Sequence, residues 1–349
     1  MTTATRPVRV ALLGYGVSGG TFHAPLIAAS PGLELAVIVT PIAEQAARAA
    51  ARYPSAAILG SPDELWRRAG DVDLVVVATA NASHVPLALA AIENGLAVVV
   101  EKPLAVTARE AEELLRTAQT RGVPLTTFLN RRWDGDFLTL RDLIAAGRLG
   151  TVRQFESRFT WWQPVTSGWR STTTVAEGGG ALYDLGPHVI DQAVQLFGPV
   201  VEAHAELDRL QPDAPAEDHA LVRLVHAGGV RSRLWMSGAT PLAGARFWVL
   251  GSRAGYVQHG LDPQESQLGA GMDAADPRCG VSPESRWGVL GTDADTAPVP
   301  TRRGEYGAFY AQLVRALTGD APLPVDPADA IATLALIERL HEESSGEAR

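Results

Sequence analysis

The chain is poor in the features that mark secreted, membrane and nucleic-acid-binding proteins. Cys279 is the only cysteine, so no intrachain disulfide can form, which is typical of the reducing cytoplasm, where we expect this protein. No stretch approaches the roughly 20 apolar residues that span a bilayer, and residues 1–7 lack the apolar core of a secretion signal. The net charge of −9 gives no electrostatic basis for binding nucleic acid or an anionic membrane. A length of 349 residues with 46% hydrophobic side chains indicates a soluble protein of two domains.

A glycine pattern near the start of the chain predicts a nucleotide-binding turn. Three glycines directly follow the apolar segment Val8–Leu13, and a second apolar segment, Leu33–Val39, follows at the spacing of a dinucleotide-binding unit. The first glycine permits the turn, the second lets the backbone approach a pyrophosphate, and the third lets helix and strand pack closely. The helix that begins there offers free N–H groups to the phosphates. The predicted phosphate-binding residues are Gly14, Gly16, Val17, Ser18 and Gly19.

The pattern of apolar residues changes near residue 130. Before that point short apolar segments alternate with helical segments, which predicts an α/β domain with a doubly wound parallel sheet, a Rossmann fold, over residues 1–128. After it, longer alternating segments predict an α+β domain over residues 129–349 with a large, mostly antiparallel open sheet. We expect the C-terminal helix to pack back on the first domain. Residues 262–300 are rich in Gly, Pro, Asp and Ser, and we expect ordered loops there with little regular structure.

Three further motifs lie where chemistry is expected. Thr79, Asn81 and His84 follow one predicted strand, and Glu101 and Lys102 follow the next, so both groups lie at the carboxyl edge of the parallel sheet, the usual ligand crevice. In the second domain a glycine run at 178–180 leads into a segment with three polar residues, Asp184, His188 and Asp191.

These motifs and the glycine fingerprint, in this order, resemble the Gfo/Idh/MocA family of nicotinamide-dependent sugar and cyclitol dehydrogenases. Residues 21–25 and 130–134 look most like the branch that contains scyllo-inositol dehydrogenases. The resemblance implies an enzyme that transfers a hydride between a nicotinamide cofactor and a secondary hydroxyl of a sugar, inositol or related polyol. It also implies that Lys102 contacts the reacting hydroxyl and that His188 is the catalytic histidine.

The chemistry of these side chains agrees with such roles. A lysine, with an ordinary pKa of about 10.4, works best as a cationic donor that stabilises a developing alkoxide. An imidazole titrates near neutral pH and is a natural proton acceptor. Asp184 precedes His188 by four residues, so in a helix both would share one face, where Asp184 would bind a substrate hydroxyl or orient the imidazole. Pro187 leaves two arrangements open: a helix kinked at that residue, or a helix that starts there with Asp184 in the entering turn.

The remaining candidates surround these groups. Guanidinium and indole groups suit a polyhydroxylated ligand. His23, in the fingerprint helix, faces either the nicotinamide or the protein core. We expect no metal site. The predicted substrate-binding residues are Lys102, Arg131, Trp133, Trp169, Arg170, Asp184 and His188, and the cofactor-binding residues beyond the glycine turn are Thr40, Thr79, Asn81, His84, Glu101 and Lys102.

The choice between NAD and NADP rests on the end of the second predicted strand. An acidic residue that binds the adenosine ribose of NAD normally lies there, but the chain has Thr40, with Glu44 slightly late and Arg48 one helical turn further on. Because the carboxylate that repels a 2′-phosphate is absent, the sequence favours NADP weakly, and both cofactors remain open.

Two other functions remain alternatives. One is an NAD-dependent glycoside hydrolase of the same superfamily, which oxidises its substrate transiently, and the other is a non-catalytic cofactor-binding sensor. A sensor needs neither Lys102 nor His188, which argues against it.

The second domain carries tryptophan among charged residues on a strand at 230–237, a composition often covered by another subunit. We therefore expect a homodimer or homotetramer.

Overall fold

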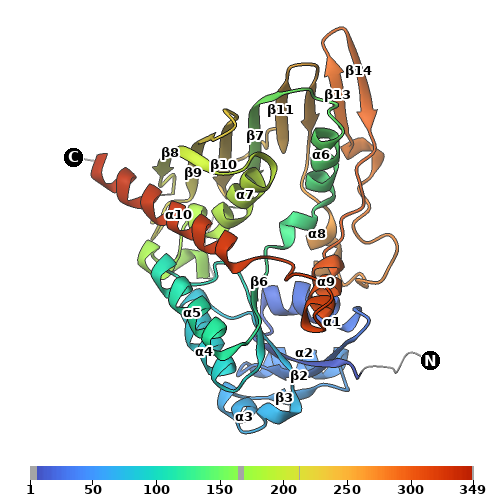
Figure 1. Ribbon diagram of the computed structural model, residues 1–349, viewed down its shortest axis with the longest axis vertical. Helices are drawn as coiled ribbons and strands as arrows, with labels where there is room; N and C mark the ends of the chain where they lie inside the picture. Colours follow the sequence, from blue (N-terminus) through green and yellow to red (C-terminus); the bar gives the residue numbers. More distant parts are fainter. Residues whose placement is uncertain (1–5, 164–168, 212, 348–349) are drawn as a thin grey trace. The chain divides into compact units, whose positions relative to one another are not determined.

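The computed structural model describes residues 6–163, 169–211 and 213–347. The chain folds as two compact units (Figure 1). The first comprises residues up to 130 together with 264–279 and 305–331, and the second comprises 131–263, 280–304 and the residues from 332 onward. The chain thus first passes from one unit to the other near the predicted domain boundary, and two later segments belong to the first unit.

The first unit is built on a six-stranded sheet in the order β3-β2-β1-β4-β5-β6, and all its strand pairs are parallel. Strands β4 and β5 are buried along their whole length, as expected for a sheet that is covered on both faces. The strand order reverses between β1 and β4, which marks the ligand crevice in sheets of this kind. The predicted doubly wound sheet is confirmed. Its strands are β1 Val8–Leu13, β2 Leu33–Val39, β3 Ala57–Leu59, β4 Leu74–Val77, β5 Ala97–Val100 and β6 Leu125–Thr127.

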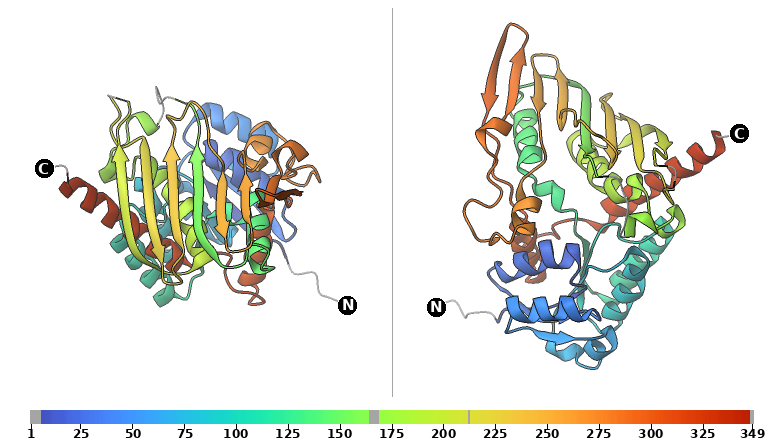
Figure 2. Two further views of the ribbon diagram at one scale, coloured as in Figure 1. Left: turned by 90° about the horizontal axis from the view of Figure 1, so that it is seen from above. Right: turned by 180° about the vertical axis from the view of Figure 1, so that it is seen from behind.

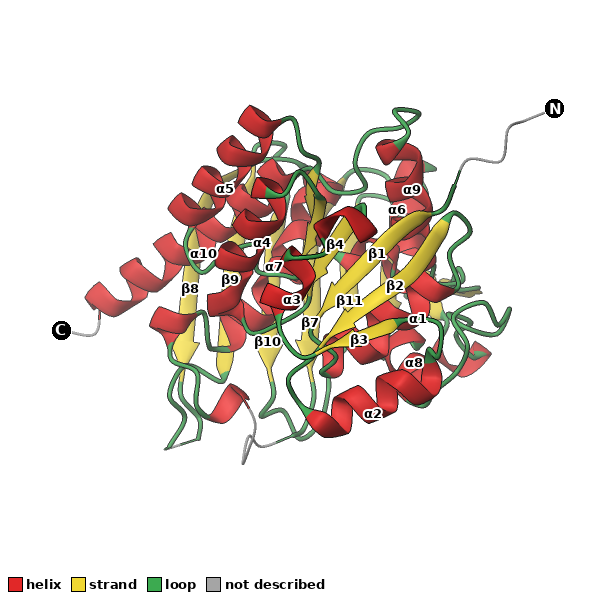
Figure 3. Ribbon diagram, turned by 90° about the horizontal axis from the view of Figure 1, so that it is seen from below, coloured by secondary structure: helices red, strands yellow, loops and turns green. Residues whose placement is uncertain are grey.

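Helices pack against this sheet and against one another (Figure 3). Local sequence fixes some ends: the helix α5 starts at a capping box in which Thr107 and Glu110 each accept the other's backbone N–H, and it ends at Gly122 with a φ of 64°. Helix α4 packs on β4, β5 and α5, and α1 packs on β2 and α9. The helices are α1 Ala24–Ala28, α2 Ala43–Arg52, α3 Pro62–Trp66, α4 His84–Glu93, α5 Ala108–Arg121, α8 Gln264–Gly269 and α9 Gly307–Leu317.

The second unit contains an eight-stranded sheet in the order β14-β13-β12-β11-β7-β10-β9-β8, seen side by side in Figure 2. Only β7 and β10 pair in parallel, so the prediction of a mostly antiparallel sheet is confirmed. Helix α7 (Ala181–Phe197) packs against β7, β9 and β10. The strands are β7 Val152–Thr160, β8 Val200–Asp208, β9 His219–His226, β10 Arg231–Ser237, β11 Phe247–Gly251, β12 Gly255–Gln258, β13 Gly288–Thr292 and β14 Asp295–Val299. Helix α6 spans Gly135–Ala145, and α10 spans Pro327–Glu347.

The prediction that residues 262–300 form little regular structure is wrong. Helix α8 and the hairpin of β13 and β14 lie in this segment, and the hairpin forms the edge of the second sheet. Its strands contain glycine and proline and are largely exposed, so their own sequence gives a weak strand signal. Pro298 is tolerated because β14 is an edge strand. Pairing with β12, rather than local preference, decides the structure here.

Candidate functional site

The glycine turn of the first unit has the close packing that the sequence predicts. Gly14 has a φ of 95°, and a Cβ there would lie 2.3 Å from the carbonyl oxygen of Ala78. A Cβ at Gly19 would lie 2.0 Å from the carbonyl oxygen of Gly14, whereas one at Gly16 would meet nothing within 4 Å. The outer glycines therefore pack against backbone and the middle one faces open space, an arrangement that fits a dinucleotide phosphate. Val17 is 79% exposed beside it.

The helix after this turn begins where the sequence predicts but contains a π-helical segment. Residues 17–18 are α-helical, Gly19–His23 forms a π-helical turn, and α1 follows from Ala24. A π turn places side chains at a different angle from an α turn and is frequent at functional sites. Here it leads to His23, whose side chain is fully buried. Of the two orientations left open for His23, the structure shows the one that faces the core.

The loop after β4 lies beside the glycine turn. The Thr79 methyl group lies 3.2 Å from the position a Cβ on Gly14 would take, and the Thr79 hydroxyl is 2.7 Å from that of Ser83. Asn81 begins the short 3-10 turn Asn81–Ser83. His84 is fully buried, with Nδ1 2.8 Å from the Pro103 carbonyl and Nε2 3.2 Å from the Thr79 carbonyl. Burial lowers the pKa of His84, and its contacts with the two carbonyls oppose that change. The ring lies between the loop after β4 and the loop after β5 and contacts both.

The loop after β5 centres on Glu101. Its carboxylate accepts hydrogen bonds from the Ser18 hydroxyl and, at 3.0 Å, from the Lys102 backbone N–H, and it lies 3.0 Å from Nε2 of His23. Burial raises the pKa of Glu101, but the His23 hydrogen bond and charge, the Lys102 charge and the Ser18 hydrogen bond outweigh it, so the pKa is lowered. The carboxylate thus joins the glycine turn to Lys102, and the following Lys102–Pro103 peptide is cis.

Lys102 is the only lysine in the sequence. Lysine and arginine total 30, so the other 29 basic side chains are all arginine. Arginine keeps its proton under all conditions relevant to proteins, whereas a lysine ammonium is a compact donor that is able to exchange its proton. A chain that uses arginine for every other cation has therefore kept lysine where a motif predicts chemistry. Sequence analysis missed this signal, although the count of one residue type contains it.

The end of β2 shows how Thr40 is used. Thr40 is buried, its hydroxyl donates to the Gln45 side chain at 2.8 Å, and it accepts the Ile42 N–H at 3.3 Å. The Arg48 guanidinium lies 5.9 Å from the centre of the Tyr15 ring, next to the glycine turn. Neither Arg48 nor Arg52, one turn later on α2, forms an ion pair with any residue that the structure describes.

In the second unit, α7 carries both polar residues of the predicted catalytic pair. The helix runs from Ala181 to Phe197 with Pro187 inside it, so Asp184 and His188 lie on one helix and Asp184 is not in an entering turn. Asp184 is 7% exposed and pairs with Arg170, whose nitrogens lie 2.7 and 2.9 Å from its Oδ2. His188 is buried, with its ring 6.4 Å from that of Phe159. Two predicted substrate residues, Arg170 and Asp184, thus contact each other directly.

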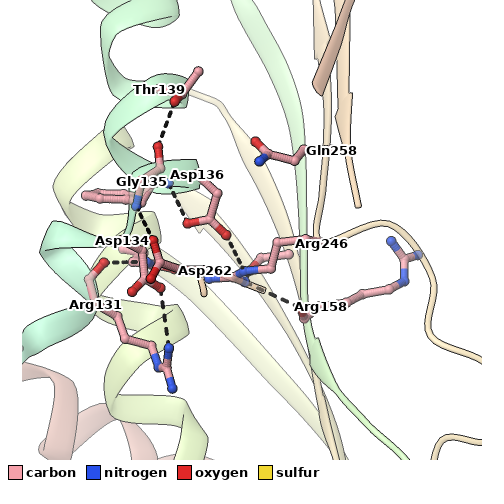
Figure 4. Close-up of polar contacts among 12 residues, drawn as sticks. Arg131, Asp134, Gly135, Asp136, Thr139, Arg158, Arg246, Gln258 and Asp262 are labelled. Atoms are coloured by element: carbon pink, nitrogen blue, oxygen red, sulfur yellow. Dashed lines mark hydrogen bonds and ion pairs between the residues drawn. The ribbon is translucent and has the colours of Figure 1, made fainter. Parts of the chain in front are cut away.

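The segment after residue 130 forms a buried ionic cluster (Figure 4). Arg131 lies 4.3 Å over the Phe159 ring and 3.5 Å from Asp134. Asp136 accepts from Arg246 Nε at 3.2 Å, and Asp262 accepts the Gly135 N–H at 2.7 Å. Burial raises the pKa of Asp134 well above its ordinary value, with Asp136 and Asp262 adding to the rise and the two arginines opposing it. At Asp134 burial and the two neighbouring carboxyl groups therefore outweigh the two arginines.

Two other predicted residues have different outcomes. Trp133 is half-buried at the end of the 3-10 turn Asn130–Trp133, next to Arg132, which forms a bidentate ion pair with Asp191 at 2.8 and 2.5 Å. The Trp169 side chain lies outside the described residues. Arg131, Arg132 and the α7 residues therefore belong to the same unit. The ion pair between Arg132 and Asp191 joins the motif at residues 130–134 to the motif on α7.

Sequence analysis also missed several buried polar residues. Glu217 accepts the Leu182 N–H at 3.0 Å at the start of α7, and a Cβ on Gly180 would lie 2.3 Å from its carboxylate. Arg246 binds Ser157 and Gln192 besides Asp136. Tyr310 lies 2.6 Å from Nδ1 of His23. Each contact joins residues far apart in the chain, so no local pattern reveals it.

Two further features of the structure bear on other classes of function. No helix in the described part of the chain is both long and apolar enough to cross a membrane. Among the residues that the structure describes, no group of three or more His, Cys, Asp or Glu side chains is arranged to hold a metal ion.

Comparison with known proteins agrees with this architecture. Residues 8–128 match the family model "Oxidoreductase family, NAD-binding Rossmann fold", and residues 137–257 match "GFO/IDH/MocA C-terminal domain". The uncharacterized oxidoreductase YdgJ of Escherichia coli is 40% identical over 95% of this chain and 94% of its own length. The scyllo-inositol 2-dehydrogenase (NADP(+)) IolW of Bacillus subtilis is 32% identical over 97% of this chain and 94% of its own. A solved structure from Yersinia pestis is 37% identical with a TM-score of 0.90, covering 98% of this chain and 96% of the other. The chain therefore belongs to the Gfo/Idh/MocA family of NAD(P)-binding oxidoreductases.

Proposed function

We propose that this protein is an NAD(P)-dependent dehydrogenase that acts on a secondary hydroxyl of a sugar, inositol or related polyol. The observation that carries the proposal is Lys102, the only lysine of the chain, which follows β5 and is tied through Glu101 to the glycine turn that fits a dinucleotide. Relatives named scyllo-inositol 2-dehydrogenase and D-glucoside 3-dehydrogenase, 32% and 31% identical, support the substrate class.

A nicotinamide dinucleotide held at the glycine turn would supply the hydride acceptor or donor, and the side chains of the protein would handle the proton and the charge. The Lys102 ammonium donates a hydrogen bond to the substrate oxygen as it becomes an alkoxide. The His188 imidazole takes the hydroxyl proton. Asp184, paired with Arg170 and four residues before His188 on α7, keeps a negative charge on that face of the helix. Arg131 and Trp133 are the further residues that we propose for substrate binding, together with Trp169.

The test is a panel of inositols and aldoses oxidised with each cofactor, with NAD(P)H formation followed by absorbance. We expect stoichiometric formation with at least one polyol. Lys102→Met should abolish turnover and keep dinucleotide binding, and Lys102→Arg should fail too, because a guanidinium does not reproduce the compact ammonium. An active Lys102→Met enzyme, or no oxidation of any polyol, would contradict the proposal.

We propose that NADP is the preferred cofactor. Thr40 leaves the end of β2 without a carboxylate, and Arg48 and Arg52 supply two cations on the helix that follows. The NADP(+)-dependent naming of IolW supports this choice. Initial rates with both cofactors test it, and Arg48→Ala should weaken NADPH binding more than NADH binding. Arg109→Ala, an exposed α5 residue paired with Glu113, is the matched control. A strong preference for NAD would overturn the proposal.

We also propose that the protein assembles as a homodimer or homotetramer through the second sheet. On β10, Arg231, Arg233 and Trp235 alternate with fully buried residues, and the Arg158 guanidinium lies 4.1 Å over the Trp235 ring. A sheet face with an aromatic residue among charges suits contact with a second copy of the chain. Light scattering at micromolar concentration tests this, and a monomeric mass would count against it.

A further inference from the structure

The residues on both sides of Lys102 are held by buried histidines. Glu101, before it, lies 3.0 Å from Nε2 of His23, and the carbonyl of Pro103, after it, lies 2.8 Å from Nδ1 of His84. Both rings are fully buried. Neither histidine belongs to the proposed proton transfer, although each stands in a motif that sequence analysis singled out. The backbone that carries the only lysine is therefore fixed on both sides.

A third buried group completes the arrangement before Lys102. The Tyr310 hydroxyl lies 2.6 Å from Nδ1 of His23, and burial together with the Glu101 charge raises the pKa of Tyr310 well above its ordinary value. Tyr310 therefore keeps its proton. Because an ionised carboxylate only accepts, the His23 Nε2–H donates to Glu101. His23 thus joins the Tyr310 hydroxyl to the carboxylate next to Lys102.

The groups that surround this hydrogen-bonded chain are aromatic, and both His23 and Tyr310 are fully buried. The His23 ring lies 4.4 Å from that of Phe128, and the Tyr310 ring lies 5.2 Å from that of Phe309. Burying polar groups in such a place costs free energy, and apolar side chains of similar volume would stabilise the fold at least as well. The second oxygen of Glu101 accepts the Lys102 backbone N–H, so the polar chain ends at the peptide of the lysine. Apolar side chains would fill the same space but would not hold the Lys102 backbone N–H by a hydrogen bond.

We propose that Tyr310, His23 and Glu101 on one side, and His84 on the other, are positioning residues that hold Lys102 in its working place. The inference rests on the proposed function for the catalytic role of Lys102. Displacing a donor by about 1 Å from a reacting oxygen costs on the order of 100-fold in rate. Residues that hold Lys102 in place avoid that loss. Glu101 and His84 are among the charged and titratable groups that interact with Lys102, and His23 and Tyr310 lie behind Glu101.

The experiment uses the full chain, produced with 13C-labelled lysine. Because the sequence has one lysine, its side-chain signals in the NMR spectrum all belong to Lys102. We expect Tyr310→Phe, which removes one hydroxyl and no carbon, to shift the Lys102 signal and to increase its mobility. Tyr256→Phe is the matched control, since Tyr256 is also fully buried and its hydroxyl donates to Gln258 at 2.5 Å. We expect the control to lose comparable thermal stability and leave the Lys102 signal unchanged.

Steady-state kinetics give a second measurement. Tyr310→Phe should lower kcat by about 10-fold or more and change the KM for the dinucleotide by less than about 2-fold, because the lysine is displaced while the glycine turn stays intact. If Tyr310→Phe does not fold, Ser18→Ala removes another donor to Glu101 and the same Lys102 signal is followed. A Lys102 signal in the variant identical to that of the unmodified protein would overturn the proposal. The NMR measurement needs no turnover. An enzyme that fails to oxidise polyols and a Lys102 signal that fails to shift are therefore separate outcomes.

Discussion

Glu101 in the first unit and Asp134 in the second are both buried carboxyl groups, yet their pKa values move in opposite directions. Burial raises both. Glu101 receives hydrogen bonds from Ser18 and the Lys102 N–H and lies against His23, and these outweigh burial. Asp134 shares its two arginines with two other carboxyl groups, so burial prevails. The number and sign of the partners, rather than depth, decide in which direction the pKa of each carboxyl group moves.

The difference separates two uses of buried charge. In the first unit the charge is kept next to Lys102, at the predicted cofactor turn. In the second unit the carboxyl groups serve to join α6, the sheet and α7, because Arg246 binds Asp136, Ser157 and Gln192 at once. One arrangement favours an ion next to the proposed catalytic lysine, and the other joins structural elements within a core.

The largest effect should come from removing the cation that the second cluster shares. Arg246→Met leaves Asp136 buried without its guanidinium, and we expect a loss of about 3–5 kcal/mol in the free energy of unfolding. Urea unfolding at pH 7 measures it. Arg68→Met removes a cation from an exposed pair with Asp71 and should cost less than about 1 kcal/mol. Equal losses in the two variants would show that the buried cluster does not hold the core.

Glu217 extends the comparison to a carboxyl group with a defined pKa, which burial raises to about 7 from 4.5. A raised folded pKa contributes stability that is complete below pH 4.5 and is lost as pH rises to about 7. That loss, relative to Glu217→Gln, should reach about 3 kcal/mol. Unfolding of both proteins at pH 5 and pH 8 measures the difference. Burial lowers the pKa of His341 to about 4, which has the opposite effect on stability. Because both proteins contain His341, this effect largely cancels in the difference. A difference independent of pH would contradict the prediction.

Much of the fold and part of the site could be predicted because the signals are local. The glycine turn at Gly14 and the polar residues after β4 and β5 lie within a few residues of the strands that position them. The partners of those residues are distant: Tyr310 is 287 positions from His23, and Arg246 is 110 from Asp136. The prediction for the segment of β13 and β14 was wrong for a related reason, because pairing with β12 and not local composition makes these residues strands.

Glu101→Gln should have a smaller effect, and it tests the first half of the comparison. The amide loses the charge that His23 and Ser18 stabilise, and we expect a loss of about 2 kcal/mol at pH 7. A lowered folded pKa contributes stability that is complete above pH 4.5 and is lost as pH falls from there through the folded pKa. The penalty of the variant should therefore shrink in acid, as measured by urea unfolding at several pH values. A penalty that grows in acid would show that Glu101 is not held as an anion.

Asp134→Asn makes the same chemical change in the second unit and should have the smallest effect, with the opposite sign in pH. Because the pKa of Asp134 is raised well above its ordinary value, an amide of similar shape replaces a carboxyl group that is neutral in acid, and we expect a change below about 1 kcal/mol at about pH 3.5. The raised pKa of Asp134 means that its contribution is complete below about pH 3.8 and is lost as pH rises. The variant should thus gain stability relative to the unmodified protein between pH 5 and pH 8, while Glu101→Gln does not. If both substitutions followed pH in the same direction, depth alone would govern these carboxyl groups.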